Sequence, residues 1–373
     1  GNAFHLNRRG YLYLTADESK VPGLTERSRR ISALGAGELR LHTADSSSYQ
    51  PSQAEGYRQE PPGADILIGS ELIQKHYPYV TANAVAGLHA RRAGWLSAQQ
   101  LGMFLIEQAR AMGMQFTSGR IETVDTRGGH VAGVRLASGE THAAPVFINA
   151  AGPFLAPVGR LVGTDLPVHT ELHLKVVIQD ALGVVERDAP LLIWDDAQFL
   201  PWEQEERRAL AADPETCWLT EAFPAGAHTR PEGSRDSRNI ILLWEYRSQR
   251  MEPAFPPVLD QTYPEVALRG LSSMLPRLTE YFDRMPKPQI DGGYYTRTDE
   301  NRPLIGPIGA QGAYVLGALS GYGIMAACGA GDLLAAHITS GSLPTYAPSL
   351  SPARYKDPLY LQSLENLDKS GQL

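Results

Sequence analysis

The chain has 373 residues, with 34 Lys or Arg and 41 Asp or Glu, and a formal net charge of −7 at pH 7. This acidic balance argues against a nucleic acid or an anionic membrane surface as the main partner. The length suffices for two domains with sizeable cores, and no apolar run reaches the roughly 18 residues of a membrane span. The two cysteines, Cys217 and Cys328, lie far apart and predict no disulfide framework, which favours a reducing compartment with the cytoplasm as the default.

The first half of the chain alternates between strand and helix patterns. Periodicity predicts a strand at 11–15, a helix at 24–34, a loop at 43–63, a short helix at 71–77 and a strand at 84–89. Ser97 is the predicted N-cap of an amphipathic helix that ends at Gly113. Glycine-containing turns then separate three predicted strands, at 121–125, 131–136 and 146–149, which indicates a β-meander.

The second half begins with a long apolar run at 172–180, which we assign to a second domain. Further strands of one mostly antiparallel sheet are predicted at 191–194 and 240–246. Helices are predicted at 202–212 and, interrupted near Pro276, at 265–282, with a Pro-, Gly- and Arg-rich loop leading to Arg238. The tail after Pro344 is expected to be a peripheral extension.

The most informative block lies near the end of the chain. It reads GGYYTRT at 292–298, RPLIGP at 302–307 and AYVLGALSGYGIM at 313–325. An apolar strand enters a glycine-rich turn, and that turn opens an alanine-rich helix. Glycines 317, 321 and 323 would let the backbone approach a ligand closely, and the positive helix end with its free N–H groups favours an electron-rich group. The block therefore predicts a cofactor site.

This block resembles the C-terminal flavin-binding segment of the D-amino-acid oxidase, glycine oxidase and sarcosine oxidase family of FAD-dependent oxidoreductases. Members carry a similar Tyr-Thr-x-Thr element, a Pro-x-Ile-Gly turn and a Gly-x-Gly turn that enters the last long helix. Residues 88–113 resemble the crossover segment of the family, and residues 119–152 resemble its meander, closing on Phe-Ile-Asn-Ala-Ala-Gly. The resemblance is least clear at 184–233.

The resemblance implies an α/β fold in which a Rossmann-like FAD-binding domain is interleaved with an antiparallel-sheet substrate domain. We expect the FAD-binding domain at 84–164 and 291–345, the substrate domain at 1–83 and 165–290, and a C-terminal extension at 346–373.

The Gly-x-Gly-x-x-Gly turn and the ribose-binding acid with which members begin are not found near the start of the sequence. We therefore expect that the pyrophosphate-binding part is missing by truncation or is contributed by a separate subunit. In either case the isolated chain is expected to bind FAD weakly and to be poorly soluble.

The resemblance also implies the residues that hold a non-covalent FAD. Gly293 stands where monomeric sarcosine oxidase has the cysteine that bonds to the flavin, so covalent attachment is not expected. The last helix would point its N-terminus at the pyrimidine end of the ring. The implied cofactor-binding residues are Ile121, Ala150, Ala151, Gly152, Gly293, Ser320, Gly321, Tyr322, Gly323, Ile324 and Met325.

Two tyrosines are candidates for the catalytic site. Tyr322 falls where the sarcosine oxidase branch has a catalytic histidine, and Tyr295 falls where the glycine oxidase branch has a carboxylate-binding arginine. Simple packing is the alternative for Tyr322. Met325 falls where a lysine would bind a substrate carboxylate, so a cation is lost there. Arg297, two residues after Tyr295, returns to the same face of a strand, with a solvated surface arginine as the alternative.

Histidines elsewhere give weaker signals. His228 and Arg230 resemble an element of the family's substrate domain and are expected to line the substrate cavity, the alternative being a turn stabilised by charge. His169 and His173 share a face if residues 168–180 form one strand. No metal site is predicted, because no third ligand has suitable spacing.

The function implied by the resemblance is FAD-dependent oxidation of a C–N bond in a small-molecule amine or amino acid. Two alternatives stay open: a non-enzymatic FAD-binding scaffold, and the flavin subunit of a hetero-oligomeric amine dehydrogenase with a partner subunit.

Overall fold

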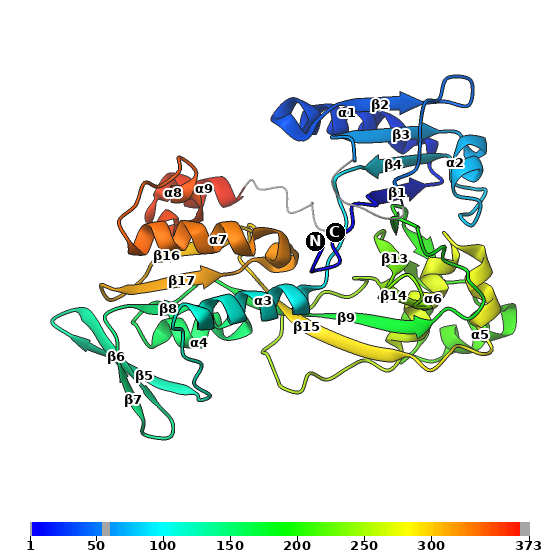
Figure 1. Ribbon diagram of the computed structural model, residues 1–373. Coiled ribbons are helices and arrows are strands. Elements are labelled where there is room, and N and C mark those ends of the chain that lie inside the picture. The colour runs from blue at the N-terminus through cyan, green and yellow to red at the C-terminus, as the bar shows by residue number, and fades with distance from the viewer. Residues whose placement is uncertain (1, 54–59, 366–373) are drawn as a thin grey trace. The chain divides into compact units, whose positions relative to one another are not determined.

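The computed structural model describes residues 2–53 and 60–365, and these residues form two compact units (Figure 1). Unit 1 contains the described residues up to Ile106, together with Leu174–Arg247 and Leu259–Gly292. Unit 2 contains Glu107–His173, Ser248–Val258 and the described residues from Gly293 onward. The mixed α/β class predicted from the sequence is confirmed.

The described residues of unit 1 are built on a nine-stranded sheet with the order β15-β9-β14-β13-β10-β1-β4-β3-β2. Its strands are β1 (Tyr11–Thr15), β2 (Leu39–His42), β3 (Ala64–Ile68), β4 (Ala86–Ala90), β9 (His169–Gln179), β10 (Leu191–Trp194), β13 (Ala227–Pro231), β14 (Asn239–Leu243) and β15 (Gln289–Arg297). From β9 to β2 in this order, neighbouring strands run antiparallel, except that β1 pairs with β10 and β2 with β3 in parallel. Residues 169–173 of β9 and 293–297 of β15 are grouped with unit 2.

Helix α6 forms the centre of the unit 1 core. The helices are α1 (Val21–Ile31), α2 (Ser70–His76), α5 (Gln204–Ala212) and α6 (Tyr263–Ser272), and α3 (Ala98–Ala111) connects the units in sequence. Every residue of α6 is buried, and Pro264 stands in its first turn, where a missing N–H costs nothing. Its leucines pack with side chains of the sheet, among them Leu12, Leu192 and Leu242.

Unit 2 contains a meander and a small mixed sheet. The meander is β5 (Ile121–Arg127), β6 (His130–Leu136) and β7 (Thr141–Ala143); the small sheet has the order β16 (Leu304–Pro307), β17 (Ala313–Gly317), β8 (Phe147–Asn149), with β17 and β8 parallel. Helix α7 (Gly323–Ile338) lies along one face of this sheet, and α4 (Leu155–Arg160) packs near β8 (Figure 1). The C-terminal helices are α8 (Ala347–Leu350) and α9 (Pro358–Glu365). Apolar clusters cover both faces, one around Leu155 and Val315 and the other around Ile305 and Leu333.

Most predicted elements are confirmed, and the exceptions have physical reasons. The predicted loop before Arg238 contains β13, a central strand whose alternating burial was concealed by its polar and proline residues. The long helix predicted at 265–282 ends at Ser272, and a separate 3-10 helix follows at Pro276–Tyr281. The tail is not peripheral, because Ala347 and Arg354 are only 1% and 6% exposed.

The boundaries of the two units differ from the expected domains at five places. Residues 165–173 are grouped with unit 2 and residues 291–292 with unit 1. Residues 84–106 are grouped with unit 1, because β4 pairs with β1 on one side and β3 on the other. Residues 248–258 are grouped with unit 2, and the described residues after 345 belong to unit 2 rather than to an extension. None of the helices in the described part of the chain combines the length and the hydropathy that a membrane span requires.

Candidate functional site

The turn between β17 and α7 has a strained backbone. Ala318 and Ser320 adopt positive φ angles of 54° and 51°, in the left-handed region that non-glycine residues rarely occupy. The nearby glycines do not carry this strain: Gly317, Gly321 and Gly323 have no positive φ, and Gly323 has φ −51°. The backbone at Gly323 is therefore one that a residue with a side chain could also adopt. Strain of this kind persists only where the surroundings impose it, and it is frequent at ligand sites.

Two of these glycines instead make room for neighbouring side chains. A Cβ at Gly317 would lie 2.2 Å from Cδ1 of Leu155, and a Cβ at Gly321 would lie 2.9 Å from Cε2 of Tyr295. Gly321 thus brings the backbone of the turn against the Tyr295 ring. Around Gly323 the space is open, with only the Leu319 Cβ at 3.9 Å.

The N-terminus of α7 is suited to an electron-rich ligand. The helix has 16 residues, and the side chain of its N-cap residue, Tyr322, makes no capping hydrogen bond. Ile324 and Met325, in its first turn, are 47% and 66% exposed. Uncapped N–H groups at the positive end of a helix, apolar side chains and open space beside Gly323 together fit a flat ring with electron-rich oxygens.

A second turn follows β8, the strand parallel to β17. Asn149 is 1% exposed; its Nδ2 donates to the Leu155 carbonyl at 2.9 Å, and its Oδ1 accepts from the Ala151 N–H at 3.3 Å. These bonds shape the predicted cofactor residues Ala150, Ala151 and Gly152, the last with φ 56° and no atom near its missing Cβ. Asn149 is not among the residues predicted from the sequence. The feature that could have indicated its role is an amide side chain at the end of the strand.

Two further predicted cofactor residues, Gly293 and Ile121, have different surroundings. Gly293 is exposed on β15, with nothing within 4 Å of a Cβ built there. Ile121 packs instead against the apolar cluster of unit 2 around Val124 and Val131.

Tyr295 lies between the glycine turn and His173. The Tyr295 and His173 rings are stacked, with centroids 3.7 Å apart and planes 15° apart. Because Gly321 adjoins the Tyr295 ring, the stack reaches the turn that opens α7. Tyr322, the other predicted tyrosine, is the half-buried N-cap residue of α7. The structure therefore brings Tyr295, Gly321 and Tyr322 into one region of unit 2.

Charged groups surround the edge of His173. Arg297 Nη1 lies 3.0 Å from Glu171 Oε2, and Arg297 Nη2 lies 3.3 Å from His173 Nε2. His169 Nε2 is 3.2 Å from Glu171 Oε1. Arg297 is only 8% exposed, so the alternative of a solvated arginine is wrong.

These contacts set the charges of the group. Burial, and then the charge of Arg297, lower the pKa of His173 to about 4. Burial raises the pKa of Glu171, but the Ser248 hydrogen bond and the charges of Arg297 and the two histidines outweigh it, so this pKa lies below its ordinary value. At neutral pH the group therefore contains a carboxylate, a guanidinium and a neutral His173. An imidazole that accepts a hydrogen bond from Arg297 at Nε2 carries its proton on Nδ1.

Only part of this group is predicted from the sequence. His169 and His173 are expected on one strand face, as β9 has them, whereas Glu171 between them is not among the candidates. The signal was the period of two, which puts residues 169, 171 and 173 on the same face. The ion pair between Glu171 and Arg297 joins the strands β9 and β15. Because these strands are far apart in the sequence, no local pattern predicts the pair.

His228 and Arg230 lie in unit 1, on β13. His228 Nδ1 is 2.7 Å from the Gly226 carbonyl oxygen, and burial lowers the pKa of its imidazole. Arg230 pairs with Glu232 at 2.5 Å, and its guanidinium carbon lies 5.0 Å from the centroid of the Trp95 ring. Both residues thus have structural contacts within unit 1.

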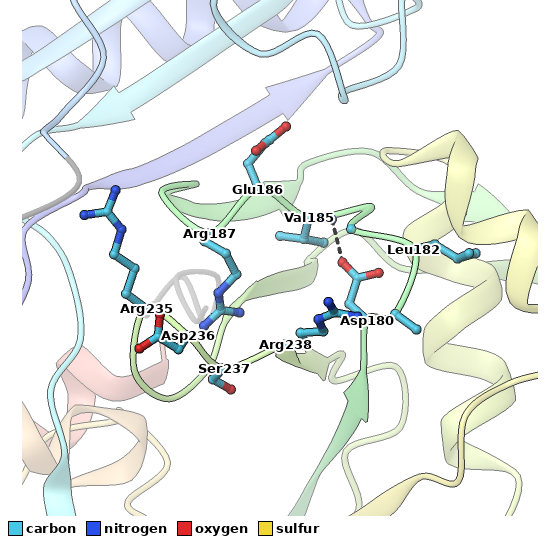
Figure 2. Close-up of a pocket in the computed structure, with 11 residues that line it drawn as sticks. Asp180, Leu182, Val185, Glu186, Arg187, Arg235, Asp236, Ser237 and Arg238 are labelled. Atoms are coloured by element: carbon cyan, nitrogen blue, oxygen red, sulfur yellow. Dashed lines mark hydrogen bonds between the residues drawn. The ribbon is translucent and has the colours of Figure 1, made fainter.

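Unit 1 also has a polar pocket of about 390 Å³ between the turn after β9 and the turn before β14 (Figure 2). Asp180, at its wall, accepts hydrogen bonds from the Val185 N–H at 2.9 Å and the Tyr281 hydroxyl at 2.6 Å. Arg187 donates to the carbonyls of Glu232 and Asn239 at 2.9 and 2.7 Å. Because its buried carboxylate and central guanidinium hold the two turns together, we assign this pocket a structural role.

Comparison with known proteins gives one family for nearly the whole chain. The family described as FAD dependent oxidoreductase (DAO) matches residues 1–337. The mitochondrial dimethylglycine dehydrogenase of Mus musculus is 24% identical over 338 residues, which cover 86% of this chain and 34% of that protein. The Homo sapiens protein is 23% identical, with 86% and 35% covered. The chain thus spans about a third of the length of these relatives.

Solved structures show the same fold. L-proline dehydrogenase from P. horikoshii superposes with a TM-score of 0.68 at 16% identity, covering 95% of this chain and 78% of that one. Glycine oxidase from Geobacillus kaustophilus gives a TM-score of 0.67 at 14% identity, with 94% and 76% covered.

Proposed function

The chain belongs to the family of FAD-dependent oxidoreductases, and we propose that the protein containing it oxidises a C–N bond of a small amine or amino acid. The observation that carries the proposal is the stack of Tyr295 on His173, held against Gly321 in the turn that opens α7. This places an aromatic face and a neutral imidazole beside the helix N-terminus suited to a flavin. Relatives whose names state an amine or amino-acid substrate, such as dimethylglycine dehydrogenase and glycine oxidase, support this choice.

FAD is the cofactor of the family, and the residues of unit 2 fit its ring. The N–H groups of Gly323, Ile324 and Met325 would hold the electron-rich end of the ring, and the open space at Gly293 and Gly323 would admit it without a covalent bond. When bound, FAD supplies the hydride acceptor. The turn after β8 would contribute Ala150, Ala151 and Gly152 to the cofactor site.

The residues of this chain would bind and orient the amine. Tyr295 presents an aromatic ring, and aromatic faces attract ammonium groups. His173 supports that ring and stays neutral at physiological pH, so it does not repel a cationic substrate. The Glu171 carboxylate attracts an ammonium group only weakly, because Arg297 neutralises it at 3.0 Å.

The same pairing bears on substrate choice. Arg297 is bound to Glu171, and neither Tyr295 nor Met325 supplies a cation, so unit 2 recognises the amine rather than a carboxylate. Within unit 1, Arg230 and His228 on β13 stay proposed substrate-contacting residues, as the family resemblance implies. This proposal requires Arg230 to leave Glu232 when substrate binds.

Anaerobic reduction tests the function. The full protein, loaded with FAD, is mixed with sarcosine, dimethylglycine, glycine, L-proline and iminodiacetate, and with amines that lack a carboxylate. We expect at least one substrate to bleach the flavin, and we expect Tyr295→Ala to slow bleaching about 100-fold, on the scale of a lost positioning contact. Stoichiometric FAD that none of these compounds reduces would contradict the proposal and favour a scaffold. Oxygen uptake compared with dye reduction then separates an oxidase from a dehydrogenase.

A further part of the protein, in the same chain or a partner subunit, is also proposed. Its support is uncovered apolar surface: α3 has no buried residue, and Ile148, on the edge strand β8, is 43% exposed. Addition of a dinucleotide-binding module should raise FAD retention and solubility.

We propose the cytoplasm as the location, because neither Cys217 nor Cys328 forms a disulfide.

A further inference from the structure

The C-terminal segment, residues 347–365, contacts the turn that follows β15. This segment lies after residue 337, where the family match ends. It consists of α8, a 3-10 helix at Pro352–Lys356, and α9. The turn in question is 298–303, between β15, which carries Tyr295 and Arg297, and β16.

Glu300, in this turn, depends on the C-terminal segment for its side-chain partners. Its Oε1 accepts hydrogen bonds from Arg354 Nε and Nη2 at 3.1 and 2.7 Å, from the Tyr355 hydroxyl at 2.5 Å and from the Tyr360 hydroxyl at 2.9 Å. The side chains of Arg354 and Glu300 are 2% and 1% exposed. Burial raises the pKa of Glu300, but the hydrogen bonds from Tyr355 and Arg354 outweigh it, so the pKa lies below its ordinary value. Glu300 is therefore a buried anion.

Arg354 also binds the backbone of the turn. Its Nη1 donates to the Pro303 carbonyl at 2.9 Å, and its Nη2 donates to the Arg302 carbonyl at 3.2 Å. Within the turn, Thr298 Oγ1 accepts from the Arg302 N–H at 2.9 Å. One guanidinium thus holds a side chain and two carbonyls of a six-residue connection, which leaves the backbone little freedom.

The side chains next to Glu300 contact β9. Arg297 pairs with Glu171 at 3.0 Å, and Asp299 Oδ1 lies 3.6 Å from His169 Nδ1. The side chain of Glu300 accepts hydrogen bonds from Arg354, Tyr355 and Tyr360 of the C-terminal segment. Residues 297–300 therefore contact the candidate site through Arg297 and Asp299, and they contact the C-terminal segment through Glu300.

We propose that Arg354 and Glu300 are positioning residues for the site of unit 2. By holding the turn after β15, they hold Arg297 against Glu171 and His173, and Tyr295 against His173. A catalytic consequence rests on the proposed function, whereas the placement of Arg297 does not.

The test replaces Arg354 in the full chain with FAD present. Arg354→Met leaves the buried Glu300 carboxylate without its cation and the Arg302 and Pro303 carbonyls without their donor, so the turn should rearrange and move Arg297 away from His173. The His173 titration, followed by NMR and assigned with His173→Gln, should then shift upward by about one pH unit, since a nearby cation no longer opposes protonation. The matched control is Arg277→Met, which removes an ion pair with Glu280 at 3.0 Å that is half exposed, and should leave the titration unchanged.

A milder variant keeps the proposal testable if Arg354→Met does not fold. Glu300→Gln preserves shape and the two backbone carbonyls bound by Arg354, and should shift the titration in the same direction by a smaller amount. If the folded variants melt at lower temperature with the His173 titration unmoved, the C-terminal segment has only a structural role and the proposal is overturned. Flavin reduction should slow about tenfold in Glu300→Gln with FAD still bound. Should the wild type oxidise no amine, the proposed function fails, while the NMR shift still decides the positioning role.

Discussion

Two buried polar clusters, one in each unit, have the same chemistry and different surroundings. In unit 1, Asp65 is held by Arg40 at 2.7 and 2.9 Å and by His42 at 2.9 Å. In unit 2, Glu171 is held by Arg297 at 3.0 Å and His169 at 3.2 Å. Each cluster also has a histidine, His89 or His173, whose pKa burial lowers to about 4.

The difference lies in what the histidines contact. His89 is 0% exposed; its Nε2 contacts the Arg9 carbonyl at 2.8 Å, and its Nδ1 lies 2.8 Å from the Tyr49 hydroxyl. His173 stacks on Tyr295, which adjoins the turn that opens α7. A shifted pKa and burial thus occur in both clusters, and only the position next to a strained turn and an uncapped helix marks one as a functional site. The predictions below test this distinction.

The largest effect is expected in unit 1. Asp65→Ala leaves Arg40 and His42 without their buried carboxylate, and should lower the free energy of unfolding by about 3–5 kcal/mol. Urea denaturation measures the loss. Lys175→Met, which breaks an exposed pair with Asp291, should cost less than about 1 kcal/mol. A similar small loss for Asp65→Ala would show that the unit 1 cluster is not a structural network.

The second prediction concerns the open space at the start of α7. Gly323→Val should abolish FAD retention, because the side chain would fill the space beside the first-turn N–H groups. The reason is steric occupation, since the backbone at Gly323 is helical. Gly331→Val, further along α7 and also with open space around it, should retain FAD. The flavin absorbance of the purified protein measures FAD retention. A Gly323→Val protein that retains this absorbance would show that the turn is not part of the cofactor site.

The third prediction concerns the pH dependence of stability. The folded protein has His173 with a pKa of about 4, below the ordinary value near 6.5, so the unfolded chain binds the extra proton between these values. The contribution of the neutral His173 to the free energy of unfolding is therefore present above about pH 6.5, and it is lost as the pH falls towards 4. His173→Gln should therefore reduce the loss of unfolding free energy between about pH 6.5 and 4 by about 2 kcal/mol. Urea denaturation at several pH values measures this difference. Parallel curves for wild type and variant would contradict the depressed pKa.

The smallest effect is expected at the strained turn itself. Ser320→Gly removes the side chain from a residue with φ 51° and should raise stability by about 1 kcal/mol or less. Ser138→Gly, in an exposed hairpin turn, lacks a positive φ and should not stabilise the protein. Thermal melting distinguishes them. A destabilised Ser320→Gly would mean that the contacts of the Ser320 side chain outweigh the strain of its backbone.

Much of the fold and the cofactor turn could be predicted from the sequence, because the signals are local. Apolar periodicity specifies β1, α2, α3 and β10 within a few residues, and the order of strand, glycine turn and helix specifies the start of α7. Ser97 was recognised as an N-cap, and its Oγ does accept from the Gln100 N–H at 3.3 Å.

Only the tertiary structure decided the rest, because those features depend on residues far apart in the chain. β13 is a strand since β10 and β14 pair with it on both sides, although its own residues favour a loop. Arg297 meets His173 across 124 positions, and Arg354 meets Glu300 across 54, so no local pattern reveals either contact. Likewise, the left-handed backbone falls on Ala318 and Ser320 and not on the glycines beside them. Local sequence sets which elements form, whereas burial and pairing between distant strands determine which charged side chains meet and where strain is held.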